Sequence, residues 1–151
     1  SIILRTSWVI SPFGKNFLLT MLNLHKNKEY IKVVADQIGG PTSTFTLGKV
    51  CWSLIFKKME NLDFPRKFHY SDSGVATWYD LACAIGEIAE ELSLVENKAI
   101  VKPIKTCEYH TPATRPNFSL LDSTDTNKML DFKEVHWRDS LREIIQKVKK
   151  F

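Results

Sequence analysis

Two side chains near the start of the chain are of types that bind sugars or phosphates. Trp8 lies near the end of the apolar segment 2–10, and Asn16 stands just before a segment of helical pattern. A tryptophan at a strand end can stack on a flat or sugar ring, because its indole offers a large apolar face. An asparagine at a helix start can donate a hydrogen bond to a hydroxyl or a phosphate. Two plainer interpretations stay open at this point: core packing for Trp8 and helix capping for Asn16.

Two later segments add further binding groups. Gln37 follows an apolar run and precedes two glycines at positions 39–40. Those glycines allow a ligand to approach the backbone closely, although a tight turn explains them equally well. Arg115 stands between two prolines, so its backbone is stiff, and a fixed guanidinium suits bidentate recognition of phosphate. A plain solvent-facing arginine remains the alternative. Together these groups predict a pocket for a nucleotide or a sugar phosphate.

Alternating strand-like and helix-like segments must position these groups. Apolar β-branched runs predict strands at 2–10, 30–35, 67–71 and 99–104. Helical periodicity predicts helices at 16–25, 44–59, 77–92 and 137–151. This alternation is typical of an α/β layered fold, in which ligands bind beyond the carboxyl ends of the strands.

Two of the helical patterns also predict which side chains are buried. Thr77 followed by Asp80 predicts a capping box at the start of the third helix. The buried stripe of that helix is expected to be Leu81, Ile85, Ile88 and Leu92. In the segment 44–59 the recurring positions predict a core face of Gly48, Cys51, Trp52, Ile55 and Met59.

Motifs of several other chemical classes are absent from the sequence. The four histidines, at positions 25, 69, 110 and 136, are isolated, so no metal site is predicted. No G-x-S-x-G nucleophile motif occurs, and the six glycines do not form the dinucleotide fingerprint G-x-G-x-x-G. The three cysteines, at 51, 83 and 107, are odd in number and far apart, which excludes a disulfide framework.

Length and composition indicate an ordinary globular protein of 151 residues, 44% of them hydrophobic. The net charge of +4 is spread along the chain, which predicts neither a nucleic-acid nor a membrane partner. No run of about 20 apolar residues occurs and no signal peptide precedes the first strand, so we expect a cytoplasmic protein. The chain opens on strand-like residues without a methionine, which we interpret as a fragment that starts within a fold.

Four motifs in one order carry a resemblance to a known family. They are R-T-S-W-V-x-S-P-F-G-K-N-F, V-V-A-D-Q-I-G-x-P-T, S-G-V-x-x-W-Y-D and T-P-A-x-R-P-x-x-S-x-L-D. This series resembles the dTDP-4-dehydrorhamnose reductases, which are extended short-chain dehydrogenase/reductases. The likeness spans nearly the whole chain but only the C-terminal half of that family.

The resemblance implies a fold and a division of labour. Residues 1–151 would be the C-terminal substrate-binding portion: the end of a Rossmann-like parallel sheet plus a smaller α/β part. The N-terminal half, absent from this chain, would bind NADPH and supply the catalytic Tyr-x-x-x-Lys pair. No Y-x-x-x-K occurs here, so we expect no catalytic residue in this chain and no turnover by the chain alone.

The resemblance also implies a substrate and the residues that bind it. Such enzymes reduce dTDP-4-dehydro-L-rhamnose to dTDP-L-rhamnose with NADPH, for polysaccharide biosynthesis. Trp8 matches the substrate-contacting tryptophan of the family, and Asn16, Gln37 and Arg115 match motif positions at the nucleotide-sugar cleft. By analogy with related enzymes, Arg115 is the candidate for the diphosphate.

Partner contacts follow from the same resemblance, and one rival interpretation comes with it. The partners would be the protein's own N-terminal half and the dTDP-sugar, with homodimerisation left open. The regulatory β subunit of methionine adenosyltransferase resembles the same family. A non-catalytic protein that acts through partner binding is therefore the alternative function.

Overall fold

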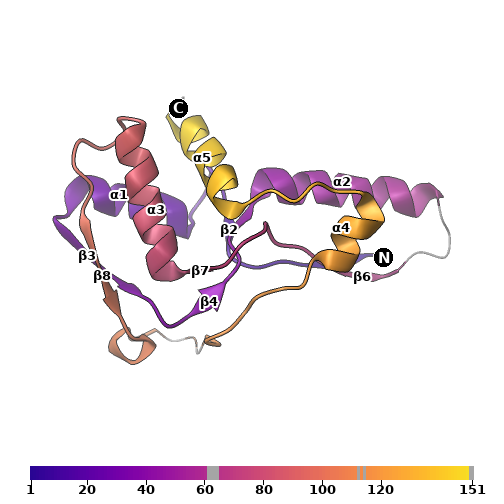
Figure 1. Ribbon diagram of the computed structural model, residues 1–151, viewed down its shortest axis with the longest axis horizontal. Helices are drawn as coiled ribbons and strands as arrows, with labels where there is room; N and C mark the ends of the chain where they lie inside the picture. The colour runs from indigo at the N-terminus through magenta and orange to yellow at the C-terminus, as the bar shows by residue number, and fades with distance from the viewer. Residues whose placement is uncertain (61–64, 112, 114, 150–151) are drawn as a thin grey trace.

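The computed structural model describes residues 1–60, 65–111, 113 and 115–149 (Figure 1). The elements form two lobes, each with its own apolar core. The first lobe packs three helices beside a parallel strand pair: α1 (Phe17–Asn27), α3 (Trp78–Glu91), α5 (Trp137–Val148), β3 (Tyr30–Val34) and β8 (Ile100–Ile104). The second lobe contains β1 (Ile3–Arg5), β6 (Lys67–His69), α2 (Thr44–Glu60) and α4 (Thr124–Leu130).

Short strands join the two lobes. β2 (Val9–Ile10) pairs in parallel with β5 (Thr42–Ser43), and β4 (Ile38–Gly39) pairs antiparallel with β7 (Ala76–Thr77). A 3₁₀ turn, η1 (Thr106–Glu108), follows β8. Three of the four strand pairs in the described residues are parallel. The predicted α/β class is therefore confirmed.

The predicted single strand at 2–10 is wrong, because the backbone turns sharply at Trp8. Trp8 has a φ of 43°, in the left-handed region that L residues seldom adopt. A strand cannot continue through that conformation. The segment therefore forms β1 and β2 instead, and each pairs with a different strand.

The start of α3 is built as the sequence predicts. The Thr77 side chain accepts a hydrogen bond from the Asp80 backbone N–H at 3.0 Å, and the Asp80 carboxylate accepts one from the Thr77 backbone N–H at 2.9 Å. Both arms of the capping box are thus present. Three of the four expected positions, Leu81, Ile85 and Ile88, are fully buried, and Leu92 is partly buried.

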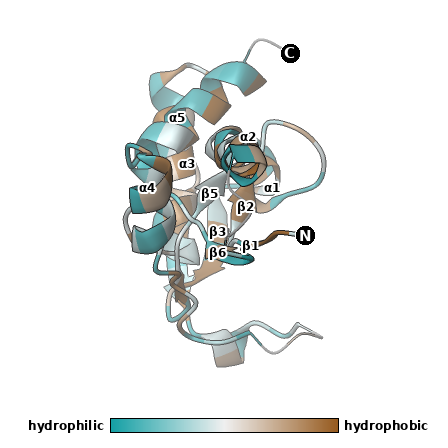
Figure 2. Cartoon of the chain, turned by 90° about the vertical axis from the view of Figure 1, so that its right-hand side faces the viewer, coloured by the Kyte–Doolittle hydropathy of each residue, from teal (hydrophilic) through white to brown (hydrophobic). Residues whose placement is uncertain are grey.

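The predicted core face of α2 is wrong, although the helix itself spans the predicted segment. Trp52 and Met59 are 62% and 78% exposed, whereas Val50 and Leu54 on the other side of the helix are buried. The buried side of α2 faces Phe68 of β6 in the second core (Figure 2, in which α2 is seen end-on). The opposite side carries an exposed apolar stripe, which we call the α2 stripe: Cys51, Trp52, Ile55, Phe56 and Met59. The predicted core position Gly48 is half-buried.

The other predicted strands and the final helix are present, together with several short elements that were not predicted. The strands at 30–35, 67–71 and 99–104 are confirmed as β3, β6 and β8, within one or two residues at their ends. The final helix is confirmed from Trp137 to Val148, while Phe151 lies outside the described residues. The short helix α4 was not predicted. In the described part of the chain, no helix has the length and apolar character needed to cross a membrane.

Candidate functional site

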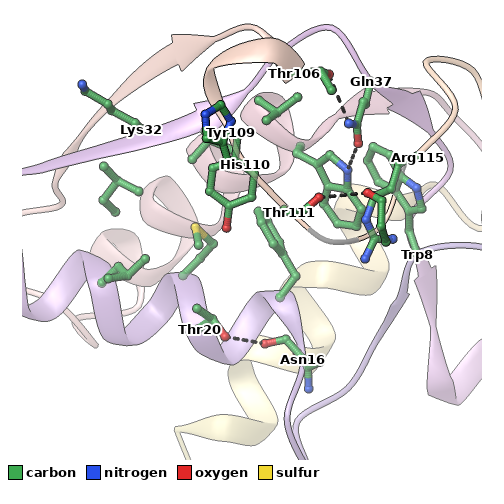
Figure 3. Close-up of a pocket in the computed structure, with 18 of the residues that line it drawn as sticks. Trp8, Asn16, Thr20, Lys32, Gln37, Thr106, Tyr109, His110, Thr111 and Arg115 are labelled. Carbon is green, nitrogen blue, oxygen red and sulfur yellow. Dashed lines mark hydrogen bonds between the residues drawn. The ribbon is translucent and has the colours of Figure 1, made fainter.

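A cleft of about 1070 Å³ lies between α1, β3 and the segment 106–115 (Figure 3). Trp8 and Trp78 line it at the carboxyl-end side of the strands, together with Gln37, which follows β3. This is the position at which open α/β sheets bind their ligands. The volume suits a ligand of nucleotide size.

The charged side chains that line the cleft are all cationic. They are Lys15, Lys28, Lys32 and Arg115, and the described part of the lining includes no aspartate or glutamate. Within the described residues, none of the four forms an ion pair. Their charges therefore remain available to an anion, and the cleft favours a negatively charged ligand.

Trp8 is held by close packing. Its ring is stacked on that of Trp78, with centroids 3.7 Å apart and planes inclined by 10°. A Cβ atom added to Gly39 would lie 2.4 Å from the Trp8 ring, so only glycine permits this approach. The glycine at position 39 thus allows a protein side chain, Trp8, to approach the backbone closely.

Gln37 is buried and both ends of its amide are hydrogen-bonded within the protein. Its Oε1 accepts from Trp78 Nε1 at 3.1 Å, and its Nε2 donates to Thr106 Oγ1 at 3.1 Å (Figure 3). Thr106 in turn donates to the Asp36 carboxylate through its hydroxyl at 2.6 Å and its backbone N–H at 2.9 Å. These two bonds, led by that of the hydroxyl, hold the pKa of Asp36 below its ordinary value.

Asn16 caps α1, as the plainer interpretation predicted. Its Oδ1 accepts from the Leu19 backbone N–H at 3.3 Å, and its Nδ2 donates to the carbonyls of Ser11 and Phe13. Asn16 also lines the cleft. Because both amide protons already have partners, its first role is to shape the turn that leads into α1.

Arg115 lies on the exposed side of the cleft, on the same segment as Tyr109 and His110. The Thr111 hydroxyl donates to the Ala113 carbonyl at 2.9 Å, which tightens the chain just before Arg115. Pro112, on which the predicted stiffness partly rests, lies outside the described residues. The structure thus brings all four predicted residues, Trp8, Asn16, Gln37 and Arg115, to one cleft.

The sequence did not single out Trp78, Thr106 or the cleft lysines. Trp78 belongs to one of the motifs quoted above, and that motif was the only available signal for it. Thr106 contacts Gln37 across 69 positions of sequence, and nothing local marks it. In the described residues, no group of three or more histidine, cysteine, aspartate or glutamate side chains could hold a metal ion.

Comparison with known proteins gives a consistent result. The model of the RmlD substrate binding domain matches residues 1–150. The dTDP-4-dehydrorhamnose reductase of Aggregatibacter actinomycetemcomitans is 38% identical over 146 residues, which cover 95% of this chain and 49% of that protein. The chain thus spans about half the length of the curated relatives it matches.

Two solved structures are similar in fold as well as in sequence. The dTDP-4-dehydrorhamnose reductase of Clostridium acetobutylicum is 34% identical with a TM-score of 0.82, over 98% of this chain and 49% of that one. The reductase of Bacillus anthracis, solved in complex with NADP, is 31% identical with a TM-score of 0.78, over 97% of this chain and 48% of that one. Together with the match to residues 1–150, these similarities establish that the chain belongs to the RmlD substrate-binding domain family.

Proposed function

We propose that this chain is the substrate-binding portion of a dTDP-4-dehydrorhamnose reductase and holds dTDP-4-dehydro-L-rhamnose in the cleft described above. The observation that carries the proposal is the cleft lining, which, among the residues that the structure describes, combines four cations outside any ion pair with aromatic rings and contains no carboxylate. A sugar nucleotide has the matching chemistry, because its diphosphate is anionic and its base and sugar rings can stack.

Within that proposal the residues of the cleft have different tasks. Arg115 would bind the diphosphate, because a guanidinium forms paired hydrogen bonds with phosphate oxygens. Trp8 would pack against the sugar. Asn16 would act indirectly, because its side chain caps α1 and shapes the turn that leads into that helix. No group of this chain is assigned a proton-transfer step.

NADPH does not fit the residues of this chain. The glycines do not form a phosphate-binding fingerprint, and the chain has no Y-x-x-x-K pair. We therefore assign NADPH and the reduction of the C4 ketone to a preceding Rossmann half and derive no cofactor step here. The product would be dTDP-L-rhamnose for polysaccharide synthesis, made in the cytoplasm.

Two surfaces support the existence of that preceding half. In the described residues, β1 pairs with β6 on one edge only, and the other edge of an edge strand presents backbone groups to which a further strand can pair. The α2 stripe leaves Trp52, Ile55, Phe56 and Met59 exposed on the same lobe. The curated relatives are about twice as long as this chain. A Rossmann half that continues the sheet beside β1 and covers the α2 stripe accounts for all three observations.

The test measures ligand binding and turnover separately. Isothermal titration calorimetry of the full-length protein with dTDP-L-rhamnose should give a binding isotherm whose affinity falls as salt is added, because the contact is partly ionic. Oxidation of NADPH with dTDP-4-dehydrorhamnose should occur in the full-length protein but not in the 151-residue chain. Absence of dTDP-L-rhamnose binding would contradict the proposed function. Binding without turnover by the full-length protein would favour the regulatory alternative.

A further inference from the structure

Trp78 is held by two ring contacts and one hydrogen bond. One face of the ring stacks on Trp8 at 3.7 Å, and Phe17 lies 4.7 Å away at a tilt of 50°. Its one polar atom, Nε1, donates to Gln37 at 3.1 Å. A tryptophan that is held by two ring contacts and a hydrogen bond from its Nε1 has little freedom to rotate. Trp78 is therefore a fixed platform at the start of α3.

Trp8 has no comparable polar anchor. Its Nε1 makes no hydrogen bond to another described residue, so packing alone sets the direction of its ring. Gly39 limits the ring on one side, and the φ of 43° fixes the backbone from which it projects. The stack with Trp78 is the ring contact that can set the plane of the indole, because the two rings lie 3.7 Å apart and are inclined by only 10°. The direction of the Trp8 ring thus depends on a residue 70 positions away.

Gln37 connects this platform to the opposite wall of the cleft. Its amide joins Trp78 to Thr106, and Thr106 is bonded twice to Asp36. Thr106 begins the segment that carries Tyr109 and Arg115 along the cleft. A continuous series of contacts therefore runs from the Trp8 ring to the segment that holds the arginine.

We infer that Trp78 is a positioning residue for ligand binding: it orients the Trp8 indole toward the sugar nucleotide, and Gln37 holds Trp78 in place. This inference rests on the function proposed above and deepens it. It also adds a positioning role for Gln37, whose amide oxygen and nitrogen each form a hydrogen bond within the protein. Trp8 contacts the ligand, and Trp78 acts through Trp8.

A double-mutant cycle tests this dependence in the full-length protein, with dTDP-L-rhamnose as the probe. We expect W8L and W78L each to weaken binding about tenfold, which corresponds to the upper range for an aromatic pair. Because Trp78 acts through Trp8, the double variant W8L/W78L should bind no more weakly than W8L. W78F keeps an aromatic ring without the Nε1 donor, and it should retain affinity within about threefold. Additive losses in the double variant would overturn the inference.

Near-UV circular dichroism tests the stack without any ligand. Two indoles stacked at 3.7 Å share one coupled signal. W8F and W78F should therefore each remove the same band, while W137F, which lies outside the cleft, should leave it unchanged. Retention of the band in W78F would refute the positioning role. If the wild-type protein does not bind dTDP-L-rhamnose, the proposed function fails, and the dichroism still decides whether Trp78 orients Trp8.

Discussion

Gly39→Ala is the smallest change that should disturb the cleft. The new Cβ would lie 2.4 Å from Trp8 Cε2 and 2.7 Å from two further atoms of the same ring. Such separations are far inside van der Waals contact, so either the Trp8 ring or the backbone at residue 39 must move. The conformation of Gly39 is one that alanine also adopts, because its φ is not positive. The effect is therefore steric and not conformational.

Overpacking of this kind typically costs about 1–3 kcal/mol, and we expect that loss in the free energy of unfolding. Part of the strain can be relieved by a shift of Trp8 toward the cleft, so the affinity for dTDP-L-rhamnose should fall as well. The matched control is Gly40→Ala. Its Cβ would lie 3.0 Å from Ser71 Oγ and 3.2 Å from Ser71 Cβ, which are milder contacts that a shift of a few tenths of an ångström relieves. We expect the control to cost less than about 1 kcal/mol.

Urea unfolding and titration calorimetry of the two variants measure both effects. A second-site change then identifies the cause: in a W8L background the ring is absent, and Gly39→Ala should become nearly neutral. If Gly39→Ala is as stable as the wild type and binds the sugar nucleotide equally well, the close packing of Trp8 does not control the cleft. The reasoning about its orientation would then be wrong.

Three further predictions concern other parts of the molecule. Arg115→Ala should weaken dTDP-L-rhamnose binding about tenfold or more and reduce the salt dependence of that binding. Arg142 pairs with a glutamate outside the cleft, so Arg142→Ala is the control and should change neither quantity; equal effects of the two substitutions would remove Arg115 from the site. In the 151-residue chain, Leu54→Ala should lower the free energy of unfolding by about 2–5 kcal/mol and Ile55→Ala by under about 1 kcal/mol, because only Leu54 is buried. In the full-length protein, calorimetric melting should show a larger loss for Ile55→Ala. An unchanged loss would contradict the proposed preceding half. Burial lowers the pKa of His25 below its ordinary 6.5, so the folded state resists protonation of this side chain. Urea unfolding should therefore show the full contribution of His25 to stability above about pH 6.5 and a decline at lower pH. A His25→Gln variant should lose that decline.

The local features of the fold were predictable from the sequence because neighbouring residues determine them. The capping box at Thr77 depends on residues three positions apart, and it is present with both arms. The same holds for Asn16, whose cap is made with Leu19. Helix periodicity also located α2 correctly. A helix with apolar residues on two sides does not reveal which side faces the core, and the exposed one, with Trp52 and Met59, was chosen wrongly.

The features that could not be predicted depend on contacts between distant segments. The sequence around Trp8 does not indicate its positive φ, because the flanking residues have the apolar pattern of one continuous strand. Trp78 and Thr106 both hydrogen-bond Gln37, which lies 41 and 69 positions away from them in the sequence. The candidate residues Trp8 and Gln37 both line the cleft, but the structure alone shows that one stacks on Trp78 and that the other hydrogen-bonds Trp78 and Thr106.

Contacts between distant segments explain why residues of the family motifs also line the cleft. Trp8 lies in the first motif, Gln37 in the second and Trp78 in the third, and these three side chains form one stacked and hydrogen-bonded unit. Each contact needs both partners, so a change at any of the three residues leaves another without its contact, and a buried amide without a partner costs about 1–3 kcal/mol. A sequence can therefore drift at exposed positions while this unit stays constant. The expected consequence is that a substitution in one motif is tolerated only when a second motif changes with it.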